Sequence, residues 1–496
     1  MKIKNKMKVM AAILAAASMV FAGCGSTASE ADSTASAADS IAAASVKTGG
    51  IYENSEDGGH AIEVDGETAG YSGATVKKTG DSQSDEADFY GENSAIFATN
   101  SAQLTLSDMD ITTDGTHANA VFSYGEGTVV NISDSTITTS GNCSGGLMTT
   151  GGGTMNASNL TIHTTGNSSA AIRSDRGGGT VTVTGGEYTT DGTGSPAIYS
   201  TADITVSDAV LTSTTSEGVV VEGKNSVTLN NVTLNANNNK HNSDKSDYYN
   251  AIMIYQSMSG DAASGLAQFS ATGGSITNAN GNVFFVNNTA TDITLSGVEI
   301  TNNGDGAFLR AAAAGWGSEG SNGGQVNLTA TGQKIDGDMI VDEVSVLNLY
   351  LKEGSTFTGA INPDGAAGDV YVELTGGSKW ILTGDSYITA LTCEADSIDL
   401  NGHTLTVDGK VYTEGAAQTG EAIEIKVSEG NGGMQPPSDN GQVPGSGNQP
   451  PEKPDGNSSE KSGNGQPPAK PDGSNGQPPE RPDGNPPEKP SGNQAT

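Results

Sequence analysis

A four-residue phrase of small, large apolar, large apolar and small or polar side chains recurs along the middle of the chain. Its first copies stand at residues 95–98, 120–123, 146–149, 171–174 and 197–200, which are steps of 25 or 26 residues. Two further phrases follow in step, and each alternates apolar and polar residues, as Leu104-Thr105-Leu106 does. Alternation is the period of a strand with one buried face. The pattern therefore predicts three short strands in every repeat.

Glycine, asparagine, aspartate and serine separate the predicted strands, as is typical of tight turns. A single repeat could not bury its apolar face, whereas stacked repeats share one core with strands about 4.8 Å apart. We therefore predict an all-β fold, a parallel β-helix over residues 48–345, with further rungs and a cap over 346–428. A sandwich or propeller is disfavoured, since a propeller blade needs about 40 residues and four strands. A left-handed β-helix would show a strict hexapeptide period.

The N-terminal segment has the layout of an export signal. Four lysines among residues 2–8 precede an apolar run over 9–21, which is too short to span a bilayer. We predict a signal peptide over residues 1–23 and a Ser/Ala-rich tether over 24–47. The alternative is an ordinary cleaved signal with an incidental cysteine at position 24.

The sequence Phe21-Ala22-Gly23-Cys24 resembles the lipobox of bacterial lipoproteins. The resemblance implies cleavage before Cys24 and a lipid on its sulfur. The protein is then expected outside the cytoplasm, surface-exposed and anchored to the cell membrane by the lipid. Two or three acyl chains on one residue would give stable anchoring.

The C-terminal segment, residues 429–496, is rich in proline, glycine and asparagine and repeats a Pro-Pro-x-Lys/Arg-Pro phrase. It has few apolar side chains to bury, so we expect a disordered tail of polyproline II character. Two roles stay open for it, a solvated spacer or a contact with cell-wall polymer.

The repeats resemble the right-handed parallel β-helix of the pectate-lyase-like superfold. Residues 340–392, and above all 378–386 (Ser-Lys-Trp-Ile-Leu-Thr-Gly-Asp-Ser), resemble the C-terminal rungs of autotransporter passenger domains, which implies further coils. Residues 48–425 are similar to uncharacterised β-helix lipoproteins of clostridia-type bacteria, on phrases such as Asp175-Arg-Gly-Gly-Gly179. That group implies a fold and a location but no established activity.

Net charge and cysteine content limit the classes of partner and metal site that the chain is expected to have. The formal net charge of −35 disfavours nucleic acid and anionic membrane surfaces as partners of the body. An acidic surface can attract divalent cations such as calcium, yet no cofactor is predicted. Cys143 and Cys393 lie too many rungs apart to pair, so we expect reduced thiols without a redox role. The chain has no CxxC motif and no Cys/His cluster along the sequence, which predicts no zinc site.

The residues offer little sign of catalysis. The best constellation is Arg173, Asp175 and Arg176, with Glu222 and Lys224 two rungs away, about 10 Å and too far for a direct pair. None of the five histidines is expected to share a register with a serine or cysteine, so no triad is predicted. We therefore expect no catalytic residues and a protein that is not an enzyme.

A possible binding surface follows from the first phrase. If its first large residue faces inward, the next faces outward, and those residues are Phe97, Phe122, Met148, Arg173, Tyr199, Val220 and Met253. An exposed ladder of this kind would suit sugar rings or a protein partner. The alternative is that a segment of the same chain covers it, or that a corner turns both residues inward. Insertions at 235–250 and 311–324 could supply a lid or binding aromatics.

The predicted ligand-binding residues are Phe97, Phe122, Arg173, Tyr199, Tyr248, Tyr249 and Trp316. The expected function is that of a non-enzymatic cell-surface lipoprotein, adhesin-like or glycan-binding, with a polysaccharide or cell-wall polymer as partner. One alternative is a structural spacer of the cell envelope. A second alternative is a polysaccharide lyase or hydrolase.

Overall fold

The computed structural model describes residues 46–84, 87–365 and 367–428, all within one compact unit, Met1–Gly441. The predictions for the signal peptide, for Cys24 and most of the tether, and for the tail at 429–496 lie outside the described residues. Within the described part, no helix is both long enough and apolar enough to cross a membrane.

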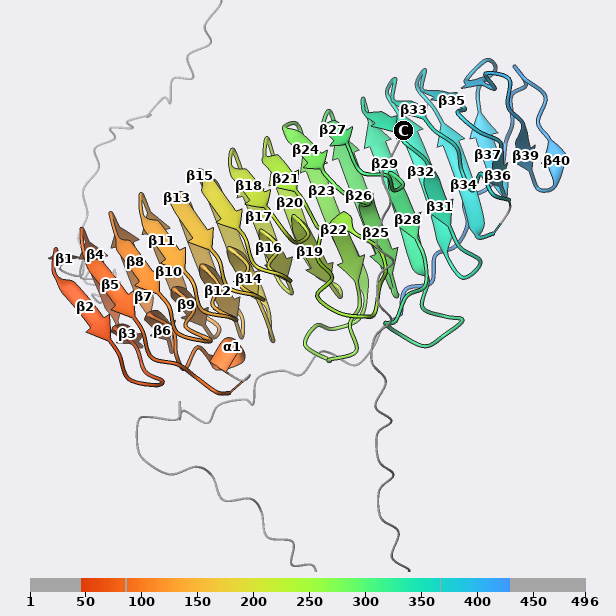
Figure 1. Ribbon diagram of the computed structural model, residues 1–496. Helices are drawn as coiled ribbons and strands as arrows, with labels where there is room; N and C mark the ends of the chain where they lie inside the picture. Colours follow the sequence, from red (N-terminus) through yellow and green to blue (C-terminus); the bar gives the residue numbers. More distant parts are fainter. Residues whose placement is uncertain (1–45, 85–86, 366, 429–496) are drawn as a thin grey trace, which may run out of the picture. The chain divides into compact units, whose positions relative to one another are not determined.

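Three rows of short parallel strands stack along the molecule (Figure 1). The first row is an 11-stranded sheet, which we call the cleft sheet. It consists of β3 (Ile62–Asp65), β6 (Ile96–Thr99), β9 (Val121–Tyr124), β12 (Leu147–Thr150), β14 (Ile172–Ser174), β16 (Ile198–Ser200), β19 (Val219–Glu222), β22 (Asn250–Tyr255), β25 (Asn282–Asn287), β28 (Leu309–Ala311) and β31 (Met339–Val341).

The second row begins at the N-terminal end with β1 (Val46–Thr48), β4 (Thr68–Ser72), β7 (Gln103–Ser107), β10 (Val129–Ser133), β13 (Gly153–Thr164), β15 (Gly179–Thr190), β17 (Asp203–Ser207) and β20 (Ser226–Asn230). It continues through β23 (Leu266–Thr272), β26 (Thr289–Ser296), β29 (Gly324–Thr331), β32 (Val346–Lys352), β34 (Asp369–Leu374) and β37 (Ala390–Cys393). Because β13 and β15 are long, each also contributes to the third row.

The third row holds β2 (Ile51–Asn54), β5 (Thr75–Lys78), β8 (Asp110–Thr113), β11 (Thr136–Thr139), β18 (Val210–Ser213), β21 (Thr233–Ala236), β24 (Ser275–Asn278) and β27 (Glu299–Asn302). It ends in a separate sheet of β30 (Lys334–Asp336), β33 (Thr356–Thr358), β35 (Lys379–Ile381) and β38 (Ile398–Asp399). The predicted all-β parallel solenoid is confirmed.

One apolar core runs through the coil, because equivalent residues of successive rungs pair directly. Ile96 pairs with Val121 and Val121 with Leu147, and all three are buried. The other two rows contribute equivalent columns, such as the one that holds Leu104 and the one that holds Ile111. The inward residue of each phrase is therefore the one predicted from the alternation.

The last rungs differ from the rest. Trp380 is fully buried, stacks on Phe357 and donates a hydrogen bond from Nε1 to the Gly359 carbonyl over 2.9 Å. A small sheet of β36 (Ser386–Ile388), β39 (Leu405–Val407) and β40 (Lys410–Val411) follows, and its β39–β40 pair is antiparallel. The chain then returns along the coil, since the Ile423 amide donates to Asn348 Oδ1 over 2.9 Å.

Candidate functional site

The N-terminal half of the predicted stripe is buried, not exposed. Phe97, Phe122 and Met148 form a small apolar cluster on the outer side of the cleft sheet, each at most 1% exposed. The cover is the segment around the short helix α1 (Ala87–Tyr90), whose next residue, Gly91, lies directly against the Phe97 ring. The expectation that Phe97 and Phe122 lie exposed is therefore wrong. The alternative, a cover from the same chain, is confirmed here.

The second half of the stripe is covered by the two insertions. Val220, Met253 and Phe285 are at most 6% exposed. Tyr248 packs on Phe285 with ring centroids 5.3 Å apart, and Trp316 packs edge-on against Tyr255 at 5.2 Å. The insertions also join each other, because the Gly315 amide donates to the Lys245 carbonyl over 2.6 Å. Tyr249 stacks instead on His241, at 4.2 Å.

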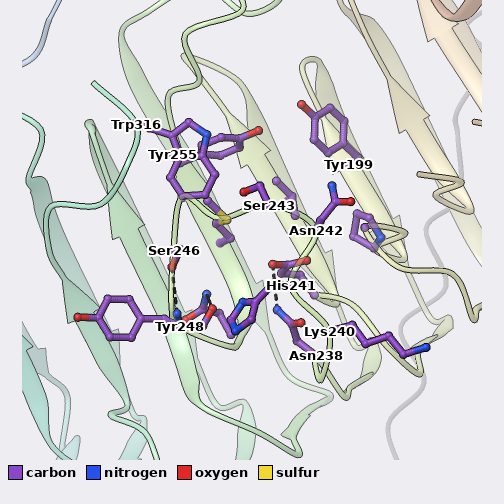
Figure 2. Close-up of a pocket in the computed structure, with 16 residues that line it drawn as sticks. Tyr199, Asn238, Lys240, His241, Asn242, Ser243, Ser246, Tyr248, Tyr255 and Trp316 are labelled. Carbon is purple, nitrogen blue, oxygen red and sulfur yellow. Dashed lines mark hydrogen bonds between the residues drawn. The ribbon is translucent and has the colours of Figure 1, made fainter. Parts of the chain in front are cut away.

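A cleft with two adjoining cavities lies between the cleft sheet and the two covers, and residues of both covers line it. One, of about 110 Å³, is lined by Trp316, Tyr255, Tyr248 and the polar side chains of Asn238 and residues 240–243 (Figure 2). The other, of about 310 Å³, is lined by residues of α1, by the coil corner at residues 117, 143, 168 and 194, and by Arg173, Tyr199 and Tyr255 of the cleft sheet. Both cavities share Gly194, Pro196, Tyr199, Asn242 and Tyr255. Tyr199 and Arg173, predicted as stripe residues, are thus half-buried walls of this cleft.

The larger cavity holds one arginine between two carboxylates. Nη2 of Arg173 lies 3.1 Å from Asp88 Oδ2 and 3.0 Å from Asp175 Oδ2, and all three side chains are largely buried. Burial would raise the pKa of Asp88, but Arg173 and His117 beside it hold that pKa below its usual range. For Asp175 burial prevails over Arg173, and the nearby Asp261 adds to it, so its pKa rises to about 7. One guanidinium thus keeps only one of its two partners firmly ionised.

A second buried acid lies on the other side of Tyr199. Glu222 is 1% exposed, and its Oε2 accepts hydrogen bonds from Tyr199 Oη and, over 3.2 Å, from Tyr255 Oη. Burial raises the pKa of Glu222, and burial next to that carboxylate raises the pKa of both tyrosines. The acids of the cleft therefore form two groups, Glu222 with its tyrosines and Asp175 with Arg173, as the expected separation of two rungs implied.

Arg176 joins two residues that line the larger cavity, Phe89 and Asp261. Its Nε donates to Asp261 Oδ1 over 2.5 Å, and its guanidinium lies 3.6 Å from the centre of the Phe89 ring. Arg176 therefore connects the α1 cover to the loop that follows β22.

A corner of the coil carries a histidine and a cysteine in register. His117, Cys143, Ser168 and Gly194 occupy the same position in four successive rungs, all with φ between 53° and 63°. Backbone bonds fix the alignment, since the His117 amide donates to Asn142 O over 2.9 Å and the Cys143 amide to Asn167 O over 2.8 Å. The expectation that no histidine shares a register with a cysteine is wrong, because these two lie one repeat apart.

Two acids of the cleft were missed by the sequence analysis, Asp88 and Glu217. Glu217 accepts hydrogen bonds from Ser216 Oγ and Asn238 Nδ2, and burial raises its pKa. A signal for Asp88 existed in the sequence, because Ile62 and Ile96 are paired neighbours 34 residues apart, not 25 or 26. The extra residues of that rung include α1.

The chain shows no significant match to any family model, curated protein or solved structure.

Proposed function

We propose that this protein is a cell-surface lipoprotein that binds an oligosaccharide in the cleft of its β-helix. The observation that supports it is the pairing of half-buried aromatic rings, Trp316, Tyr255 and Tyr199, with a dense set of side-chain amides and hydroxyls in one cavity. Aromatic faces pack against the apolar faces of sugar rings, and the polar groups take up hydroxyls. The lipid anchor rests on Cys24, as expected from the sequence.

The length of the cleft favours a chain of sugars over a single one. The two cavities together follow the rungs from His117, ahead of β9, to Tyr255 in β22. Five rung spacings at about 4.8 Å correspond to roughly 24 Å. A linear oligosaccharide could contact several rungs at once, with different side chains at each.

The test begins with a glycan array and polysaccharide pull-down on the full chain. Trp316 then reports binding, because the only other tryptophan, Trp380, is fully buried in the core. We expect a ligand from the array to change the intrinsic fluorescence, and Trp316→Ala to weaken binding about tenfold or more. Tyr350→Ala is the matched aromatic control, since Tyr350 lies in β32 outside the cleft sheet. Absence of binding to every glycan, or equal loss in both variants, would overturn the proposal.

A polysaccharide hydrolase is the second candidate, and Asp175 favours it. A carboxyl with a pKa of about 7 is partly protonated at neutral pH, as a general acid must be. Release of reducing ends from the bound glycan, abolished by Asp175→Asn, would support hydrolysis. Binding without any product would leave the cleft as a binding site only.

A further inference from the structure

The corner of the larger cavity brings together three different metal-ligating side chains. One ligand atom each from Asp88, His117 and Cys143 lies within 4.8 Å of the other two. Asp88 and His117 are buried and Cys143 is half-buried, and all three line the larger cavity of the cleft. We propose that these three residues form a binding site for a divalent metal of the zinc type, open to the cleft. This site does not depend on whether the cleft binds a glycan.

One of the three spacings matches tetrahedral coordination. Zinc binds imidazole nitrogen and carboxylate oxygen at about 2.0–2.1 Å, so adjacent ligand atoms stand about 3.3 Å apart. His117 Nδ1 and Asp88 Oδ1 are 3.3 Å apart. Coordination through Asp88 Oδ1 would leave the ion pair between Asp88 Oδ2 and Arg173 Nη2 in place.

The donor set selects the metal class. A thiolate, an imidazole and a carboxylate suit zinc and its borderline neighbours, whereas calcium and magnesium take oxygen ligands. Two anionic ligands also balance the two charges of the metal, which favours binding at a partly buried site. Three protein ligands leave a fourth position for water or a ligand hydroxyl from the cavity.

The surroundings hold the ligands in place. Asn119 Nδ2 donates to Asp88 Oδ1 over 3.2 Å, and Asn119 Oδ1 accepts from the Gly145 amide over 2.8 Å. Arg173 Nη2 fixes the other oxygen of Asp88. Such outer contacts orient metal ligands and tune their affinity.

Cobalt(II) titration of the full chain tests the site, with Cys24→Ser in every sample so that two thiols remain. We expect one equivalent to bind, with a thiolate-to-cobalt charge-transfer band in the near ultraviolet that zinc abolishes by competition. Cys143→Ser should lose the band, and His117→Ala should weaken binding at least tenfold. Cys393→Ser is the matched control and should keep both, because Cys393 lies far along the coil in β37.

Thiol alkylation provides a second readout. Zinc should slow the reaction of Cys143 with iodoacetamide in the parent, and not in Asp88→Asn. A missing charge-transfer band, or a band that persists in Cys143→Ser, would overturn the metal site. Fast alkylation that depends on His117 and ignores zinc would also overturn it, and would indicate a thiol nucleophile activated by histidine.

Discussion

The ring of Phe97 lies 5.9 Å from the ring of Phe122 on the next rung, and both are sealed on the outer side of the cleft sheet. The parallel register stacks the two phenylalanines directly, since Phe97 pairs with Phe122 across β6 and β9. A second, smaller core therefore lies outside the coil, between the sheet and the α1 segment.

Phe122→Ala should destabilise the protein by about 3 kcal/mol, because it leaves a cavity in that outer core. Thermal unfolding followed by circular dichroism measures the change. Met258→Ala is the control, since Met258 is 66% exposed and surface changes of this kind stay within about 0.5 kcal/mol. Equal melting temperatures for Phe122→Ala and the parent would mean that α1 does not seal this cluster in solution.

Gly91→Ala should loosen the α1 cover. Gly91 has φ +75°, and a Cβ there would stand 2.7 Å from the Phe97 ring, closer than real contacts allow. Gly297→Ala separates the close contact from the strain of a positive φ, because Gly297 has φ +60° and nothing within 4 Å of its Cβ position. We expect faster proteolysis around residues 79–95 in Gly91→Ala only. The same proteolysis pattern in both variants would assign the effect to backbone strain alone.

The repeat was predictable from the sequence because the apolar residues recur with its period. The phrase around Ile96 returns at every rung, and no tertiary information is needed to place it inward. The outer face was different. Whether Phe97 meets water depends on where residues 87–95 fold back, and that is a tertiary event with no period to follow. The alignment of His117 with Cys143 was available from the repeat step of 26 residues.

The charge pairs of the cleft could not be predicted from the sequence, for a related reason. Asp88 reaches Arg173 only through the cover, so no spacing between them could indicate a salt bridge. The two insertions, by contrast, interrupted the repeat visibly, and Tyr248 and Trp316 from them do contact the cleft sheet or its edge. The breaks in the regular repeat therefore indicated which segments cover the cleft sheet, whereas the residues of the stripe did not.

Asp175→Asn should stabilise the protein at alkaline pH. Burial raises the pKa of Asp175 to about 7 from 3.8, and Arg173 offsets this only in part, since it is shared with Asp88 while Asp261 lies nearby. A raised carboxyl pKa means that stability falls as pH rises from about 4 to about 7, and that the full penalty remains above 7.

Asparagine cannot ionise, so the Asp175→Asn variant should exceed the parent by roughly 2–4 kcal/mol near pH 8 and match it near pH 4. Urea unfolding at several pH values measures this difference. Asp110→Asn at an exposed strand position controls for the loss of one negative charge. A variant less stable than the parent at pH 8 would mean that the Arg173–Asp175 pair outweighs burial.

Tyr199→Phe should destabilise the protein more at high pH than at low pH. Burial raises the pKa of Glu222, while the hydroxyls of Tyr199 and Tyr255 lower it by donating to the ionised carboxylate. Removing one donor leaves the buried carboxylate less stabilised, at a cost of about 1–3 kcal/mol where Glu222 is ionised. Below the ordinary carboxyl pKa the acid is neutral in both the folded and the unfolded chain, so that cost shrinks. Urea unfolding of Tyr199→Phe, Glu222→Gln and the double variant, near pH 8 and near pH 4, isolates the pair by its coupling energy. A coupling energy that is the same at both pH values would show that the ionised form of Glu222 is not what Tyr199 stabilises.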